Sequence, residues 1–109
     1  MIETTIESIE NKVRNADIRE EDKEELLRLL STLETEVLGL SETHPEAAES
    51  IAGFTRLSAH EATRGQRNEK LVSLSTKGMI SSIEGFERTH EELVRIVNSI
   101  AYILSNMGL

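Results

Sequence analysis

The four-residue pattern Thr-His-x-Glu occurs twice in this chain, at residues 43–46 and again at residues 89–92. Histidine nitrogens and glutamate oxygens are both ligands of divalent transition metals. If the fold places the two patterns side by side, a set of four ligands for one ion results. A metal-binding protein that uses His44, Glu46, His90 and Glu92 is therefore one hypothesis for the function.

The same pattern is also typical of a helix start, where it forms a capping box. There the threonine hydroxyl and the glutamate carboxylate each bond a backbone N–H group that the first turn leaves unpaired. A glycine lies four residues before each threonine, and glycine is common just past the end of a helix. We favour this interpretation, in which each pattern joins a helix stop to a helix start. The predicted caps are Gly39, Thr43, Glu46, Gly85, Thr89 and Glu92.

Other catalytic chemistry finds little support in the sequence. Without cysteine, disulfides, thiolate zinc sites and cysteine nucleophiles are excluded. His60 and His90 are each followed by glutamate, as in the zincin motif His-Glu-x-x-His, but the second histidine is missing. The serines lack a Gly-x-Ser-x-Gly context, and no glycine-rich phosphate loop occurs. We expect a protein that is not an enzyme and holds no cofactor, with His60 facing solvent.

The net charge of −8 is unevenly distributed along the chain. Residues 1–49 hold 14 acidic and 5 basic side chains, whereas residues 50–109 hold 6 acidic and 7 basic ones. Duplex binding needs a basic footprint, so the overall charge argues against nucleic acid as a partner. The one locally basic stretch runs from Arg56 to Lys77. We interpret it as solvated surface, and a weak contact with anions or nucleic acid is the alternative.

The sequence also bears on membranes and secretion. Its first ten residues, MIETTIESIE, lack the basic and apolar regions of a secretory signal. No stretch approaches the run of about 18 apolar residues that a transmembrane helix needs. We therefore expect a soluble, cytoplasmic protein with no membrane partner.

Apolar residues recur at helical spacing along most of the chain. The composition includes one proline and 3% aromatic residues, which favours helices over a β-sandwich. Gly65, inside a polar run, predicts a break, after which Asn68 caps a new helix. We predict one domain, residues 1–109, with an all-α fold: an antiparallel bundle of four to five helices. They are expected at residues 2–15, 19–38, 44–64, 69–84 and 90–107, with Gly108 ending the last.

Narrow apolar seams on the first two helices indicate self-association. A helix of about 13 residues is marginal in water unless it packs against a neighbour, and a narrow seam is typical of coiled-coil contacts. We predict that a homodimer completes the bundle, and that the chain is a self-associating interaction or structural protein with a possible further protein partner. Phe54 and Phe86 are assigned to the core. The predicted interface residues are Ile2, Ile6, Ile9, Val13, Leu26, Leu30 and Leu33.

The C-terminal quarter resembles a family of small bacterial helical proteins classed as a domain of unknown function. That family ends with a Phe-x-x-Ser-His-Pro-x-Leu helix start, an apolar helix and an Asn-Met-Gly-Ile terminus. Glu91 replaces the family's proline, which the earlier copy of the pattern carries as Pro45, and the resemblance does not place residues 50–75. The resemblance implies a helical protein with no assigned catalytic role. The matching residues are Phe86, Thr89, His90, Leu93, Asn106, Met107, Gly108 and Leu109.

Overall fold

The computed structural model describes residues 2–107, which form five α-helices and no strand. The helices are α1 (Ile2–Arg14), α2 (Glu20–Ser41), α3 (Pro45–Thr63), α4 (Glu69–Ser82) and α5 (Glu91–Asn106). The prediction of an all-α fold is thus confirmed, and the predicted helix ends lie within three residues of the observed ones. The predicted stop at Gly108 lies outside the described residues.

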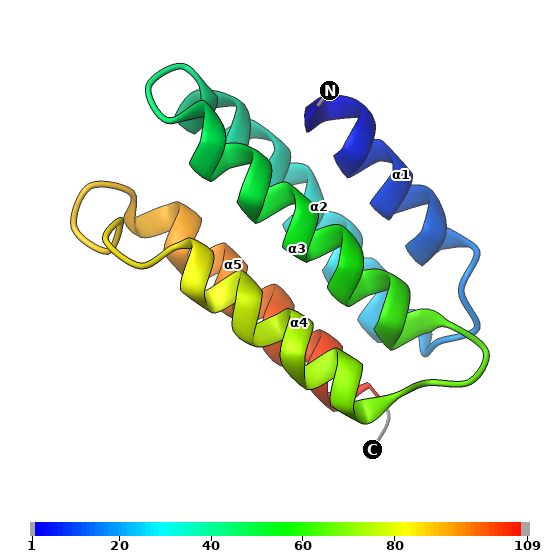
Figure 1. Cartoon of the computed structure of the whole chain (residues 1–109). Helices are drawn as coiled ribbons and strands as arrows, with labels where there is room; N and C mark the ends of the chain where they lie inside the picture. Colours follow the sequence, from blue (N-terminus) through cyan, green and yellow to red (C-terminus); the bar gives the residue numbers. More distant parts are fainter. Residues whose placement is uncertain (1, 108–109) are drawn as a thin grey trace.

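The central helix of the bundle is α3, which contacts each of the other four helices. Among the described helices, α1 packs against α2 and α3, whereas α4 packs against α3 and α5. Figure 1 shows α2 and α5 behind α3 and α4, with α1 beside them at one edge. The chain therefore forms two layers, and α3 separates α1 from α4.

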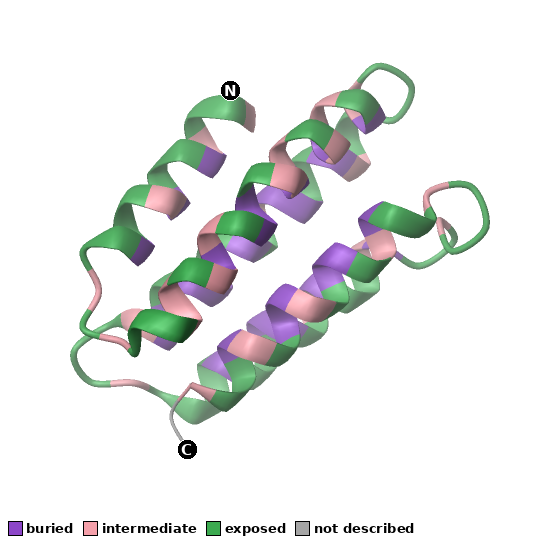
Figure 2. Ribbon diagram, turned by 180° about the vertical axis from the view of Figure 1, so that it is seen from behind, coloured by how far each residue is buried: buried purple, intermediate pink, exposed green. Residues whose placement is uncertain are grey.

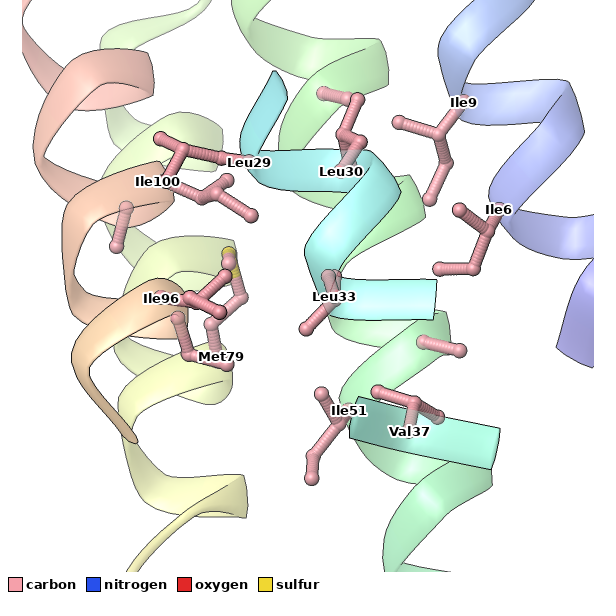
Figure 3. Close-up of a cluster of buried hydrophobic side chains, with 14 of the residues drawn as sticks. Ile6, Ile9, Leu29, Leu30, Leu33, Val37, Ile51, Met79, Ile96 and Ile100 are labelled. Carbon is pink, nitrogen blue, oxygen red and sulfur yellow. The ribbon is translucent and has the colours of Figure 1, made fainter. Parts of the chain in front are cut away.

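The core is made of aliphatic side chains from all five helices, and the buried face of each helix points inward (Figures 2 and 3). Burying one such side chain contributes about 2 kcal/mol to folding, so these residues dominate the stability. The largest fully buried side chains are Ile6, Ile9, Leu26, Leu30, Leu33, Leu40, Ile51, Met79, Leu93, Ile96, Ile100 and Leu104.

Most of the predicted dimer interface belongs to this core. The seam of α1 is covered by α2 and α3, and the seam of α2 is covered by α1, α3 and α5. Only Ile2 is half-buried. Because these seams are filled within one chain, the interface predicted from them is wrong. Its other six members, each at most 1% exposed, are Ile6, Ile9, Val13, Leu26, Leu30 and Leu33.

The buried face of α3 also differs from the prediction. Phe54, assigned to the core from the sequence, is 38% exposed, and Phe86 is half-buried. Small side chains let neighbouring helices approach α3 closely, and they leave no room for a phenylalanine ring in the centre. Apart from Glu61, the buried residues of α3 are Ala48, Ile51, Ala52, Thr55, Ser58, Ala59 and Ala62.

The break between α3 and α4 is confirmed. Helix α3 ends at Thr63 and α4 begins at Glu69, with Gly65 between them. Asn68 is the N-cap of α4, and its side-chain oxygen accepts a hydrogen bond of 3.1 Å from the backbone N–H of Leu71. This bond satisfies one of the free N–H groups of the first turn, which fixes where α4 starts.

Candidate functional site

The two Thr-His-x-Glu patterns lie at the same end of the molecule, at the α2–α3 and α4–α5 connections (Figure 1). His44 and His90 are the N-cap residues of α3 and α5, and neither helix has a side-chain cap hydrogen bond. Each threonine hydroxyl instead lies next to Nδ1 of the following histidine, at 2.8 Å for Thr43 and 2.9 Å for Thr89. The predicted capping boxes are therefore not formed.

The glycines beside these patterns do not behave alike. Gly39 lies inside α2, which continues to Ser41, so the predicted helix stop at Gly39 is wrong. Gly85 has a φ of +95°, the one positive φ among the described residues, and its N–H donates to Oε1 of Glu87 at 2.9 Å. Gly85 thus turns the chain after α4, as a residue without Cβ can do at low cost.

The glutamates of the two patterns are not caps either. Glu46 is exposed in the first turn of α3. Glu92 accepts two hydrogen bonds from the guanidinium of Arg95, the shorter being 2.7 Å, and this bond lowers the pKa of Glu92. Glu46 has no role as a cap, and Glu92 forms an ion pair with Arg95 on the surface.

The fold does bring the two histidines together, with Phe86 as the third member of the cluster. The ring centroids of His44 and His90 are 6.4 Å apart, and Phe86 lies 5.3 Å from His44 and 5.4 Å from His90. All three pairs are edge-to-face, an arrangement in which each aromatic pair contributes about 1 kcal/mol. This His-Phe-His cluster ties one connection to the other.

The four predicted metal ligands are not brought together there. In the described part of the chain, no group of three or more histidine, aspartate or glutamate side chains is placed to hold a metal ion. The predicted set of His44, Glu46, His90 and Glu92 is thus incomplete, because the carboxylates do not join the imidazoles. The remaining histidine, His60, is exposed as predicted, and its Nδ1 lies 3.2 Å from Nζ of Lys12.

A different feature stands out on the outer surface, between α3 and α4. A groove of about 250 Å³ is lined by Phe54 and Leu57 from α3 and by Leu71 and Leu74 from α4. These four side chains are 38%, 46%, 37% and 56% exposed, respectively. We call this feature the α3–α4 groove. Leucine and phenylalanine side chains that gather on one exposed surface mark binding sites more often than scattered ones do.

One end of the groove is shaped by Gly78. A Cβ atom built on Gly78 would clash with the Cδ1 and Cε1 atoms of the Phe54 ring. The ring therefore rests on the bare backbone of α4, which holds Phe54 against the groove instead of leaving it free in solvent.

The other end of the groove holds an ion pair whose carboxylate is buried and whose arginine is exposed. Glu61 is 7% exposed and accepts a hydrogen bond of 2.8 Å from Arg64. The pair neutralises the one carboxylate among the residues that line the groove, so the groove offers no unpaired negative charge.

Three of the groove residues, Leu57, Leu71 and Leu74, lie within the basic stretch from Arg56 to Lys77. Arg67 is committed to the fold: it bonds Glu69 at 2.8 Å and the backbone oxygen of Ser105 at 3.0 Å, and so fastens the α3–α4 connection to α5. The first of these bonds lowers the pKa of Glu69. Arg67 is therefore not free to bind an anion or a nucleic acid.

The groove was not predicted from the sequence. One signal was present. Ile51, Thr55, Ser58 and Ala62 follow one another at i, i+4, i+7 and i+11, and this stripe of smaller residues is the buried face of α3. Leu57 lies off that stripe and therefore has to face solvent or a partner.

A second hollow, of about 520 Å³, lies between α4 and α5 and combines Ile80 and Tyr102 with polar residues such as Asn98. Its mixed lining makes it the weaker candidate. No helix within residues 2–107 combines the length and apolar character needed to cross a membrane.

Comparisons with protein-family models, with curated proteins and with solved structures found no match for this chain. The resemblance of the C-terminal quarter therefore rests on its motif alone.

Proposed function

We propose that this chain is a non-enzymatic protein-interaction module that binds an α-helix of another protein in the α3–α4 groove. The observation that carries the proposal is the exposure of Phe54, Leu57, Leu71 and Leu74 along one groove. They follow helical spacing, i and i+3, on each of the two helices. Two parallel rows of apolar side chains are what an amphipathic helix needs to lay its apolar face between them.

The size of the groove supports a helix over a larger partner surface. The four exposed side chains form one small apolar patch, and the largest patch on a monomer, about 300–600 Å², is often functional. A stable dimer buries about 800 Å² per partner. A single docked helix matches the available area better than a second folded copy of this chain does.

The hydrogen bonds of the Ser75 hydroxyl support a role without catalysis. The Ser75 hydroxyl, which lines the groove, donates to backbone oxygens of Leu71 and Val72 within its own helix, at 2.8 and 3.1 Å. A hydroxyl bonded in this way is satisfied locally and has no base held against it, as a nucleophile requires.

The architecture is proposed to be antiparallel, since Phe54 lies over Gly78 while Glu61, further along α3, shares the groove with Leu71. The absence of cysteine suits a reducing compartment such as the cytoplasm. A homodimer stays a prediction; with the α1 and α2 seams filled, the α3–α4 groove is one exposed apolar surface that could serve it.

The test compares capture of partner proteins from a lysate of the native cell by three immobilised forms of the chain. They are the wild type, the groove variant Leu57→Ser with Leu74→Ser, and the control variant Tyr102→Ser. Tyr102 is 72% exposed and lies on α5, outside the groove. We expect the wild type and the control to retain the same partner, and the groove variant to lose it.

Capture that is unchanged by the groove variant would refute the proposal, because binding would then occur elsewhere. Sedimentation of the purified wild type tests the second copy as occupant. A dimer that the groove substitutions convert to a monomer would replace the docked helix with self-association.

A further inference from the structure

Basic side chains lie on both sides of the α3–α4 groove. On the α1 side, Leu57 also lines an adjoining hollow of about 320 Å³ together with Lys12, Arg56 and His60. On the α4 side, Lys70 and Lys77 flank Leu74 at i−4 and i+3, which places them on neighbouring positions of the helix surface. The apolar rows therefore run between two basic borders, in a chain whose net charge is −8.

The acidic side chains of this region do not cancel the basic borders. Glu61 is paired with Arg64, and Glu69 is paired with Arg67, each at 2.8 Å. Within the described residues, no ion pair joins Arg56, Lys70 or Lys77 to an acidic side chain, and all three are exposed. Three cations around an apolar groove are thus available to a ligand.

A second copy of this chain fits these charges poorly. In a two-fold dimer the same surface faces itself, so the basic borders of the two copies would be brought together. A ligand with the opposite charge has no such penalty, and complementary charge speeds its association and excludes wrong partners.

The bundle already holds one helix of the complementary kind. The 13-residue helix α1 buries Ile6, Ile9 and Val13 against α2 and α3, and carries Glu3 and Glu7 on its exposed side. Because α3 lies between α1 and α4, the α3–α4 groove is on the side of α3 opposite α1. A similar helix from another protein can bind there.

We infer that the partner is an acidic amphipathic helix, with apolar residues at i, i+3 or i+4, and i+7, and with glutamate or aspartate on both sides of them. The apolar residues fill the groove between Leu57 and Leu74, and the acidic ones pair with Arg56, Lys70 and Lys77. This inference rests on the proposed function, since it names the chemistry of the helix that the groove binds.

The test uses two synthetic helical peptides of about 15 residues, each labelled with fluorescein. Both carry leucine at i, i+3, i+4 and i+7; one has glutamate and the other lysine at the flanking positions. Fluorescence anisotropy with the full chain should give at least about tenfold tighter binding for the acidic peptide. Raising the salt from about 0.05 M to about 0.5 M should shrink that difference, because exposed charges are screened.

Two variants of equal net charge locate the effect. Lys70→Glu with Lys77→Glu should remove the preference for the acidic peptide, whereas Arg14→Glu with Arg88→Glu, both exposed and outside the borders, should leave it nearly intact. An equal loss in both variants would mean that only net charge matters and would overturn the inference.

The remaining outcomes separate the inference from the proposed function. If both peptides bind equally, and Leu57→Ser with Leu74→Ser abolishes binding, the groove binds helices without regard to charge and the inference fails alone. If neither peptide binds the wild type, both the inference and the proposed function fail. Circular dichroism of each variant confirms that it is folded.

Discussion

The contact between Phe54 and Gly78 yields a prediction in which one substitution has opposite signs in two backgrounds. Glycine inside a helix costs about 1 kcal/mol relative to alanine, so Gly78→Ala would stabilise α4 if nothing lay above it. In this structure the Phe54 ring occupies the place of the new Cβ and has to move.

The cost of moving the ring follows from its burial. With 38% of Phe54 exposed, about 120 Å² of this side chain is kept from solvent, which stabilises the fold by about 3 kcal/mol. Losing half of that contact or more outweighs the helix gain. Gly78→Ala should therefore lower the free energy of unfolding by about 0.5–2 kcal/mol, since the gain and the loss partly cancel.

The control is the same substitution without the ring. In a Phe54→Ala background, Gly78→Ala should raise the free energy of unfolding by about 1 kcal/mol. Urea unfolding of the four proteins of this double-mutant cycle measures the coupling, expected to be about 2 kcal/mol. A gain of about 1 kcal/mol in both backgrounds would show that the ring does not rest on Gly78.

Further substitutions test other parts of the structure. Gly39→Ala should stabilise by about 0.5–1 kcal/mol because Gly39 is helical with open space around it, whereas Gly85→Ala should destabilise by about 1 kcal/mol because its φ is positive; thermal unfolding measures both. Ile9→Ala should cost about 2–4 kcal/mol, and the cost should be the same at every protein concentration, since Ile9 packs within one chain; a cost that grew on dilution would restore the dimer seam. The pKa of Glu34 is raised by its partial burial and by the acidic side chains of α1, Glu10 foremost, so ionised Glu34 lowers the stability of the fold above the ordinary glutamate pKa. Glu34→Gln should therefore raise the free energy of unfolding by at most about 0.5 kcal/mol at pH 7. At low pH, where Glu34 is protonated in the folded and the unfolded state, the substitution should give no increase.

Much of the fold could be predicted from the sequence, because apolar spacing and polar breaks are local signals. The cap at Asn68 and the break at Gly65 were correctly placed for this reason. Gly39 was not, since a glycine near a helix end does not say whether the helix continues for one more turn, and α2 does continue.

Local sequence patterns could not predict the α3–α4 groove, nor what covers the apolar seam of α1. Whether Ile6 faces another copy or the same chain depends on which helix covers it, and that is decided by the packing of α3. Phe54 was misplaced for a related reason: its size predicts burial, but the smaller residues of α3 fill the centre. The two histidine patterns were predicted to be similar and are similar, although each hydroxyl lies next to a ring nitrogen and neither caps the helix that follows.

The position of α3 has a consequence for how the molecule opens. Helix α3 touches each of the other helices. Detachment of α1 or α4 exposes one face of α3, but α3 still packs against its remaining neighbours. Amide protons of α3 should thus exchange with deuterated water last, through global unfolding, and those of the outer helices earlier, through partial opening. The groove would then lie on the boundary between the slowest-exchanging helix and one that can be released.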